Sequence, residues 1–115
     1  MKRPGQIVLF RFPQADLSEG KLRPALLLSQ VPGPYNDWLV CMVSYQLRQY
    51  IADFDELIGE GDSDFSQSGL KSPSVIRVGR LAVVEDEMLL GSTGEIGSDR
   101  LDRIRKRLLD WIGSE

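Results

Sequence analysis

The sequence predicts a mainly β protein, a small β-barrel that ends in one C-terminal α-helix. Short runs of apolar and β-branched residues are separated by Pro, Gly and Ser along most of the chain. Only the last segment changes to the spacing of an amphipathic helix. Several short strands and one helix within 115 residues form a small barrel most economically. No shift in composition marks a second domain, so residues 1–115 are expected to form a single domain.

Three segments in the first half of the chain are expected to be strands. They are residues 7–12, residues 25–29 and residues 38–44. The first is β-branched and aromatic, and the other two are continuous apolar runs, which predicts central positions in a sheet. A Pro/Gly loop at residues 31–34 joins the two central strands, so we expect a hairpin. Residues 14–22 are polar and contain Gly20, so we expect a mobile loop that leads into Arg23.

The second half of the chain contains shorter segments. Strands are expected at residues 74–78, 81–84 and 88–90, and turns at residues 66–69 and 85–87. Residues 53–58 are ambiguous between a short helix and an edge strand, and we assign them to a strand. The final helix follows from apolar residues at helical spacing, with Ser98 as the expected N-cap and Gly113 just beyond the helix end. The apolar residues are Leu101, Ile104, Leu108, Trp111 and Ile112.

Composition limits the chemistry that is available. The chain has no His and a single Cys, Cys41, which excludes Cys/His zinc sites, Ser-His-Asp triads and Cys-His pairs within it. We therefore expect no metal and no cofactor, and we expect Cys41 to be a buried core thiol. Acid–base work near neutral pH would depend on carboxylates, Lys or Tyr, or on Arg and hydroxyl groups that act mainly by hydrogen bonding.

The charges are segregated along the chain. The formal net charge is −3, and residues 53–64 contain six acids and no base. Residues 65–84, in contrast, contain Lys71, Arg77 and Arg80 and no acid, and residues 1–23 contain five bases and two acids. A polyanion could therefore bind locally to an acidic protein.

The expected location is the cytoplasm, in a reduced state. The longest stretch without charge, residues 24–36, contains three prolines and is shorter than the roughly 20 apolar residues that a membrane span needs. Lys2 and Arg3 are not followed by the apolar region of a signal peptide. With one Cys, no disulfide framework is expected either.

Four blocks of sequence, in a fixed order, resemble one protein family. They are GQIV leading to FP at residues 5–13, KLRPALLLS at residues 21–29, VSYQ at residues 43–46 and GLKSPSVIR at residues 69–77. A shorter signature, Ile96-Gly97, comes just before the predicted helix. This order is similar to that of the MazF/PemK-like toxins of bacterial toxin-antitoxin pairs, and it spans most of the chain. One block alone, such as Arg-Pro-Ala, would be common by chance.

The resemblance implies a fold and an activity. It implies an SH3-like β-barrel with a C-terminal helix, usually a homodimer, that cleaves single-stranded RNA such as mRNA at selected sequences without a metal ion. In such enzymes the 2′-hydroxyl attacks the neighbouring phosphate and leaves a 2′,3′-cyclic phosphate and a 5′-hydroxyl. A cognate antitoxin inhibits the enzyme. The dimer contact would involve the C-terminal helix or the strand around Met42.

The resemblance also implies the site residues. Arg23 and Ser44 would be catalytic, and RNA would be bound by Lys21, Gln46, Lys71 and Arg77. The chemistry of the catalytic pair agrees, because a guanidinium matches phosphate geometry bidentately and a hydroxyl can donate to a non-bridging oxygen. Arg23 is a poor general base, since the pKa of Arg lies above about 12. The sequence departs from the family where Ser44 replaces the commoner Thr, and where Gly79 stands at a position that is acidic in some relatives.

Other interpretations remain open from the residues alone. Arg23 could pair with Asp16 or Glu19 at the entry of a strand, and Ser44 could bond only to the backbone at a strand end. Gln46, Lys71 and Arg77 could be ordinary solvated residues. The protein could also be a barrel that serves as a binding or dimerisation module without nuclease activity, or a toxin directed at DNA gyrase.

Overall fold

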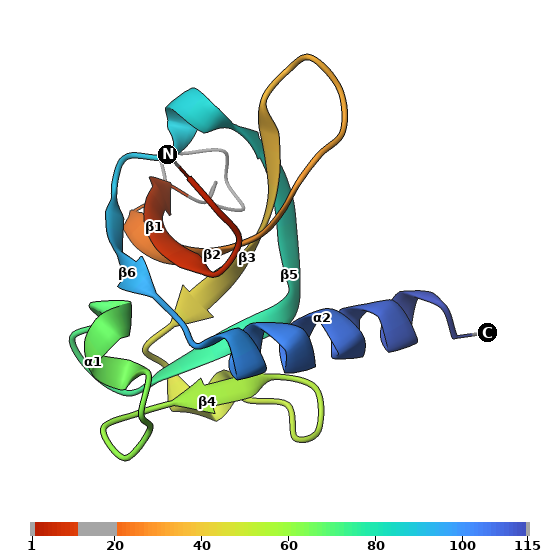
Figure 1. Cartoon of the computed structure of the whole chain (residues 1–115). Coiled ribbons are helices and arrows are strands. Elements are labelled where there is room, and N and C mark those ends of the chain that lie inside the picture. The colour runs from red at the N-terminus through yellow and green to blue at the C-terminus, as the bar shows by residue number, and fades with distance from the viewer. Residues whose placement is uncertain (1, 12–20, 115) are drawn as a thin grey trace.

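A curled antiparallel sheet forms the body of the protein (Figure 1). The computed structural model describes residues 2–11 and 21–114, and within these residues the sheet has six strands in the order β4-β5-β3-β2-β1-β6. The strands are β1 (Gln6–Arg11), β2 (Leu22–Gln30), β3 (Asp37–Ser44), β4 (Glu56–Ile58), β5 (Ser74–Glu85) and β6 (Ser92–Glu95). The sheet curls into a half-barrel whose edges are β4 and β6, which confirms the predicted mainly β, barrel-type fold.

Both faces of the two central strands are buried, as their continuous apolar sequences predict. Alternate residues of β2 and β3 contribute to two separate apolar clusters. Leu26 and Cys41 belong to the cluster that also holds Ile104 of the C-terminal helix, while Leu27 and Val40 belong to the other. The predicted hairpin is confirmed, because β2 and β3 pair in antiparallel register. Cys41 is fully buried, and this burial raises the pKa of its thiol.

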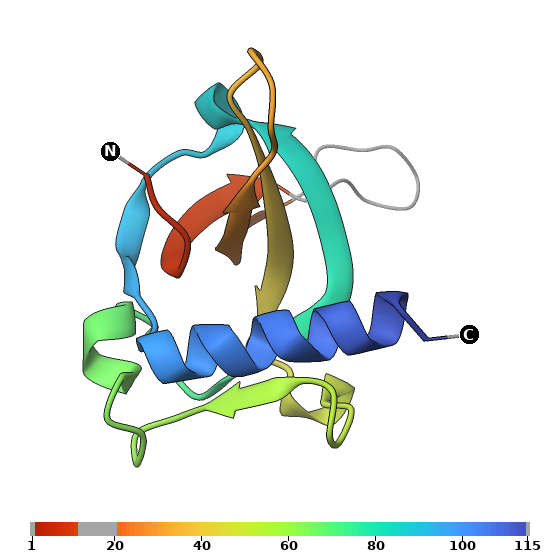
Figure 2. The ribbon, with the colours of Figure 1, turned by 45° about the vertical axis from the view of Figure 1, so that its right-hand side comes forward.

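The helix α2 (Ser98–Ile112) crosses one end of the curled sheet, next to β4 (Figure 2). Ile104 and Leu108 are buried under it, as the helical spacing predicts, but Ile112 is 64% exposed. The expected N-cap is shifted by one residue, since the cap is Gly97 and Ser98 is the first helical residue. The expected end is confirmed, with Gly113 as the C-cap.

The longest strand corrects a prediction. The sequence predicts two strands at residues 74–78 and 81–84, but β5 runs through both. Its pairing with β3 jumps from Met42↔Arg77 to Cys41↔Leu81, so residues 78–80 form a bulge without partners in β3. A bulge bends a strand sharply while keeping it in the sheet. The low apolarity of Gly79-Arg80 therefore marks a bend, and the interpretation as an inter-strand gap is wrong.

The last strand of the sheet also differs from the prediction. No strand forms at residues 88–90, because residues 86–88 are a 3₁₀ turn, η2 (Asp86–Met88), and Leu89 is buried in the second apolar cluster. The last strand is β6, whose polar sequence carries no alternation of apolar residues. Its position depends on Gly94, where a Cβ atom would lie 2.0 Å from the Gln67 carbonyl oxygen. Only a glycine permits this close backbone approach.

The remaining short segments differ in detail. Residues 66–69 are mostly a single helical turn, α1 (Phe65–Ser68), which ends at Gly69 with a left-handed φ of 73°. The strand predicted at residues 53–58 is confirmed only for its last three residues, β4. A further 3₁₀ turn, η1 (Leu47–Gln49), follows β3. Of the loop predicted at residues 14–22, Leu22 already belongs to β2 and residues 14–20 lie outside the described part of the chain.

No helix among the described residues is both long and apolar enough to cross a bilayer.

Candidate functional site

Arg23 and Ser44 lie on neighbouring strands and on the same face of the sheet. The β2–β3 register pairs Ala25 with Met42, and two further residues in the same register place Arg23 opposite Ser44. Opposite residues of an antiparallel pair project to the same face, so by this extension of the register Arg23 and Ser44 share one face of the sheet. The hydrogen-bonded pairing with β3 ends next to Pro24, which has no N–H to donate. Arg23 and Ser44 therefore lie two residues beyond the last β2–β3 partners, Ala25 and Met42.

Arg23 is a half-buried arginine whose guanidinium makes no hydrogen bond or ion pair with residues 2–11 or 21–114. Its backbone is held by pairing with Phe10 of β1. The alternative partners that the sequence suggests, Asp16 and Glu19, lie outside the described residues. With respect to the described part of the chain, the guanidinium can bind an anion without first breaking an ion pair.

Ser44 makes the backbone hydrogen bond that one interpretation of the sequence predicts. Its side chain is only 3% exposed, and its Oγ accepts a hydrogen bond from the Gln46 backbone N–H at 3.1 Å. This bond at the end of β3 is the structural role expected of a strand-end serine. A hydroxyl also has one O–H to donate, and the Ser44 O–H has no acceptor among the described residues. The backbone bond therefore orients the oxygen while its proton stays available.

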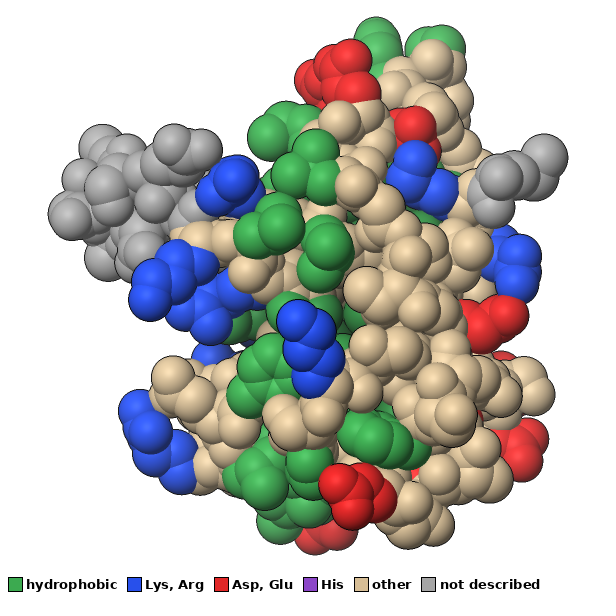
Figure 3. Space-filling view, turned by 90° about the vertical axis from the view of Figure 1, so that its left-hand side faces the viewer, with side chains coloured by type: hydrophobic (Ala, Val, Ile, Leu, Met, Phe, Trp, Pro, Cys, Tyr) green, Lys and Arg blue, Asp and Glu red, His purple; other side chains and the backbone are tan. Residues whose placement is uncertain are grey.

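Arg77 joins the same face from the third adjacent strand. It pairs with Met42 of β3, two residues before Ser44, and so projects to the side on which Arg23 and Ser44 lie. Arg77 has no ion pair among the described residues either. We refer to Arg23, Met42, Ser44 and Arg77 as the arginine face. Figure 3 shows several Lys and Arg side chains along the left edge of that view, where no acidic side chain is seen, and others at its centre and right edge.

The other three predicted RNA-binding residues are exposed. Gln46 lies in the turn after β3, and only its backbone N–H reaches Ser44. Lys21 directly precedes β2, and Lys71 lies in the bend before β5. Neither lysine has a side-chain partner among the described residues. The register thus places Arg23, Ser44 and Arg77 on one face of the sheet, whereas Lys21 and Lys71 lie outside the paired strands.

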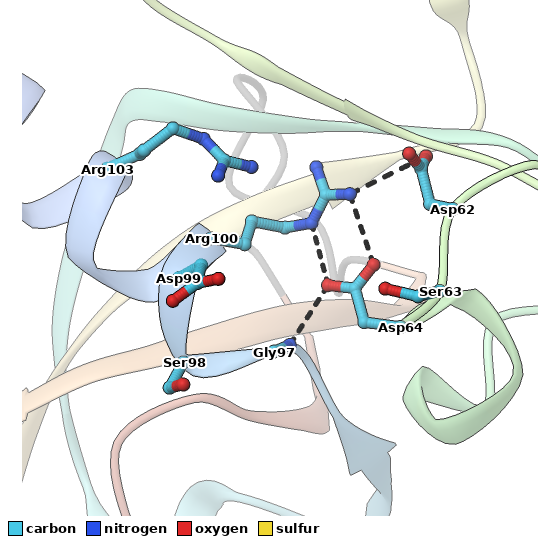
Figure 4. A pocket seen from close by; sticks show the side chains of 8 residues that line it. All are labelled: Asp62, Ser63, Asp64, Gly97, Ser98, Asp99, Arg100 and Arg103. Atoms are coloured by element: carbon cyan, nitrogen blue, oxygen red, sulfur yellow. Dashed lines mark hydrogen bonds and ion pairs between the residues drawn. The ribbon is translucent and has the colours of Figure 1, made fainter.

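A hollow of about 310 Å³ lies beside another arginine, Arg100 (Figure 4). Arg100 is 6% exposed and holds Asp64 bidentately, with Nε 2.8 Å from Oδ2 and Nη2 3.1 Å from Oδ1. Its Nη1 donates to Glu56 at 3.0 Å and to the Leu57 carbonyl at 2.8 Å, and Nη2 lies 3.5 Å from Asp62. Each of the five N–H groups of Arg100 therefore has a nearby acceptor.

This cluster, which we call the Arg100 network, ties α2 to β4 and to the start of α1. Glu56 receives two more arginines of α2, Arg103 at 2.9 Å and Arg107 at 2.6 Å. Burial alone would raise the pKa of Asp64, but hydrogen bonds from Arg100 and from the Gly97 N–H lower it below its usual value. The hollow is therefore lined by groups that already satisfy one another, and it offers no free cation to a phosphate.

Acidic and Cys side chains do not gather into a metal-binding group of three or more anywhere in residues 2–11 and 21–114. The chemistry that the arginine face can perform is the binding of an anion by guanidinium groups, next to a hydroxyl that can donate one hydrogen bond.

Arg80 is the residue that sequence reasoning left out of the candidate site. It lies in the β5 bulge three residues after Arg77, is exposed, and has no described partner. The charge pattern places it in the positive segment, but a predicted gap between two strands concealed that it remains next to Arg77. The signal that could have found it is the Gly-Arg pair inside an otherwise β-branched run, which is typical of a bulge.

Comparison with known families gives one match that covers nearly the whole chain. Residues 3–112 match the family model described as the PemK-like, MazF-like toxin of type II toxin-antitoxin systems. A search of curated protein sequences found no match.

Solved structures with the same fold come from this group of proteins. A crystal structure of MazF from Deinococcus radiodurans aligns with a TM-score of 0.70 at 24% identity, over 98% of this chain and 97% of that chain. An endoribonuclease in complex with its cognate antitoxin, from a mycobacterial species, aligns with a TM-score of 0.72 at 13% identity, over 100% and 98% of the two chains. A MazE-MazF complex from Deinococcus radiodurans gives 0.68 at 19% identity, over 99% and 97%. At these identities the likeness concerns the fold.

Proposed function

The chain belongs to the PemK-like, MazF-like toxins of type II toxin-antitoxin systems, and on this basis we propose that it is an endoribonuclease that cleaves single-stranded RNA without a metal ion. The observation that carries the proposal is the arginine face. A guanidinium without a described partner lies on the same face of the sheet as a serine whose oxygen is held by a backbone N–H.

The reaction suits a site without histidine. The 2′-oxygen attacks the adjacent phosphorus, the bond from phosphorus to the 5′-oxygen breaks, and the products are a 2′,3′-cyclic phosphate and a 5′-hydroxyl. The proton that leaves the 2′-hydroxyl is balanced by the proton that the 5′-oxygen takes up, so there is no net consumption of acid or base. The site must chiefly stabilise the additional negative charge on the phosphorane.

Arg23 would supply this stabilisation. Its planar fork can donate two parallel hydrogen bonds to phosphate oxygens, and these bonds strengthen as charge accumulates on the oxygens in the transition state. The Ser44 O–H would donate a further hydrogen bond to a non-bridging oxygen. Because the Gln46 N–H already holds the Ser44 oxygen, the hydroxyl needs little reorganisation during the reaction.

The substrate is held by charge around this pair. Arg77 would bind a neighbouring phosphate from the same face, and the exposed side chains of Lys21, Gln46 and Lys71 would contact RNA at its margins. Sequence selectivity would then arise from contacts with unpaired bases.

We also propose that the protein acts in the cytoplasm as a homodimer that a cognate antitoxin inhibits. Support for the antitoxin comes from the toxin family itself and from solved structures of this fold that are antitoxin complexes. An antitoxin segment that covers Arg23 would exclude RNA from it. Leu109 and Ile112, which are 72% and 64% exposed, give the end of α2 the apolar surface that a dimer contact needs.

The test is cleavage of a mixed-sequence single-stranded RNA in EDTA by the purified protein, followed by identification of the new ends. We expect cyclic phosphate and 5′-hydroxyl ends. Ser44→Ala should lower kcat/KM about 10²- to 10³-fold, the cost of removing one donor at an oxyanion site, and Arg23→Ala should lower it at least as much.

Arg3→Ala is the matched control, since it removes an exposed arginine that pairs with Glu95 of the edge strand β6. This variant should cleave as the parent does. Intact RNA at high concentrations of the parent protein would contradict the proposal and favour a binding or dimerisation module. Cleavage that requires added metal, or that Arg23→Ala retains, would contradict the assigned mechanism.

A further inference from the structure

A pocket of about 230 Å³ opens beside the β5 bulge. It lies between the bulge and the segment that joins η1 to β4. The residues that line it are Ile51, Phe54, Asp55, Arg77, Gly79 and Arg80. Because Arg77 also belongs to the arginine face, the pocket continues that face away from Ser44.

The floor of the pocket is built by a buried carboxylate. The bulge leaves the backbone N–H of Val78 without a partner in β3, and it donates instead to Asp55 Oδ1 at 3.0 Å. The other oxygen of Asp55 accepts from the Ile51 N–H at 3.0 Å, and the side chain is only 2% exposed. From the far side, Arg107 donates to the Asp55 carbonyl at 2.8 Å. Both oxygens of Asp55 thus accept backbone hydrogen bonds, and neither forms an ion pair with Arg77 or Arg80.

The walls of the pocket are apolar. Phe54 packs edge to face on Trp111 of α2, with ring centroids 5.4 Å apart and an interplanar angle of 78°. A Cβ atom at residue 79 would lie 3.1 Å from Phe54 Cε2, so glycine at this position lets Phe54 pack against the bulge. Ile51 forms the open side and is 53% exposed.

The rim of the pocket is cationic. Arg77 and Arg80 have no ion pair with any described residue, although the chain contains 17 acidic residues to 14 basic ones. An apolar wall beside two unpaired guanidinium groups matches the two halves of an unpaired nucleotide, which are a flat base and a phosphate. An acidic peptide would use the arginines but would leave Phe54 and Ile51 without a partner.

We propose that this pocket binds one unpaired nucleotide of the RNA, adjacent to the phosphate that is cleaved. The base contacts Ile51 and Phe54, and its phosphate lies between Arg77 and Arg80. This inference rests on the proposed function and extends it, because it makes the β5 bulge a specificity element that lies outside the catalytic pair.

The experiment follows the two tryptophan indole N–H signals by ¹H–¹⁵N NMR during titration with a random-sequence pool of 2′-O-methyl RNA, which cannot be cleaved because the 2′-oxygen is blocked. Trp111 packs against Phe54 at the pocket, and Trp38 is buried in the second apolar cluster. We expect the Trp111 signal to shift with binding and the Trp38 signal to remain in place.

Three variants separate the contributions. Arg80→Gln should weaken binding of the pool about tenfold, the loss expected for one charge-assisted contact, and should reduce the slope of log affinity against log salt by about 0.7. Ile51→Ser should weaken binding without changing that slope, because it removes an apolar contact. Arg3→Gln, the control, removes another exposed guanidinium, one that pairs with Glu95 of β6, and should bind as the parent does.

The outcomes distinguish this inference from the proposed function. If the protein cleaves RNA but the Trp111 signal does not shift and Arg80→Gln binds normally, the pocket is not a nucleotide site and the nuclease proposal stands. If a polyglutamate peptide shifts Trp111 and the RNA pool does not, the pocket is a peptide site and the inference is overturned. If the parent protein neither binds the pool nor cleaves RNA, both proposals are wrong.

Discussion

Two regions of this molecule use arginine in opposite ways. In the Arg100 network every N–H of the guanidinium faces a protein acceptor, and the side chain is 6% exposed. On the arginine face, Arg23 and Arg77 are half-buried and make no ion pair with any described residue. A hollow adjoins each region. Among the described residues, only the arginine face offers guanidinium groups that can bind an anion without displacing a carboxylate. Whether the guanidinium already has protein acceptors therefore distinguishes a structural arginine from a candidate binding arginine. The presence of a hollow does not distinguish the two kinds of arginine.

The difference has a physical origin in where the acids lie. Residues 53–64 contain six acids, and three of them, Asp55, Glu56 and Asp64, are buried and held by donors. Glu56 and Asp64 pair with Arg100 of α2, and Glu56 also pairs with two further arginines of that helix. The Asp55 carboxylate accepts from backbone N–H groups instead. Arg23 and Arg77 have no acid paired with them among the described residues, and Asp55, which lines a pocket with Arg77, accepts from backbone N–H groups instead.

The largest expected effect is on stability, from Arg100→Met. Removing the guanidinium leaves Asp64 and Glu56 buried with only part of their partners, and breaking a buried ion pair in this way costs about 3–5 kcal/mol. Urea denaturation should show a lower midpoint with an unchanged m-value. Arg3→Met, which breaks an exposed pair with Glu95, should change stability by less than about 1 kcal/mol. Equal losses in the two variants would remove the contrast between the regions.

The second effect is on activity, from Arg23→Lys. Lysine keeps the positive charge but loses the planar fork, so we expect kcat/KM for RNA cleavage to fall about 10- to 100-fold while the urea midpoint stays the same. A variant that retains full activity would show that only charge is needed at this position. A large loss of stability would show that Arg23 is a structural residue like Arg100.

The smallest effect is a pH dependence confined to the Arg100 network. Asp64 has a lower pKa in the folded protein than in the unfolded chain, so it contributes stability that is present above the unfolded value of about 3.9. This contribution is lost as pH falls through the lowered folded value. In urea denaturation, Asp64→Asn should therefore be less stable than the parent at neutral pH, and the difference should shrink below about pH 4. A constant difference across the acidic range would contradict the assignment.

The strands that the sequence predicted well are those whose apolar pattern is continuous. The segments at β1, β2 and β3 and the helix α2 were predicted to within a few residues, because burial of a whole face requires that pattern. The last strand was misplaced, since β6 is held by backbone pairing to β1 and by the close approach at Gly94, neither of which needs an apolar side chain. The β5 bulge was missed because a break in apolarity looks the same whether a strand ends or bends.

The candidate site was foreseen in part. Arg23, Ser44 and Arg77 were expected from the family resemblance, and the register of β2, β3 and β5 places them on one surface. Their catalytic and RNA-binding roles stay predictions, as do those of Lys21, Gln46 and Lys71. Arg80 and the pocket at Phe54 could not be predicted, because they depend on how far the bulge displaces one strand from its neighbour.

By itself the sequence determined the class of fold, the order of the main strands, the burial of Cys41 and the family to which the chain belongs. Each of these depends on local pattern, and the hydrophobic effect acts on local pattern whatever the long-range contacts are. Only the tertiary structure decided which of the many arginines are neutralised and which remain open. The reason is that an ion pair forms between residues such as Glu56 and Arg100, 44 positions apart, and its strength depends on distance and burial, which no linear spacing contains.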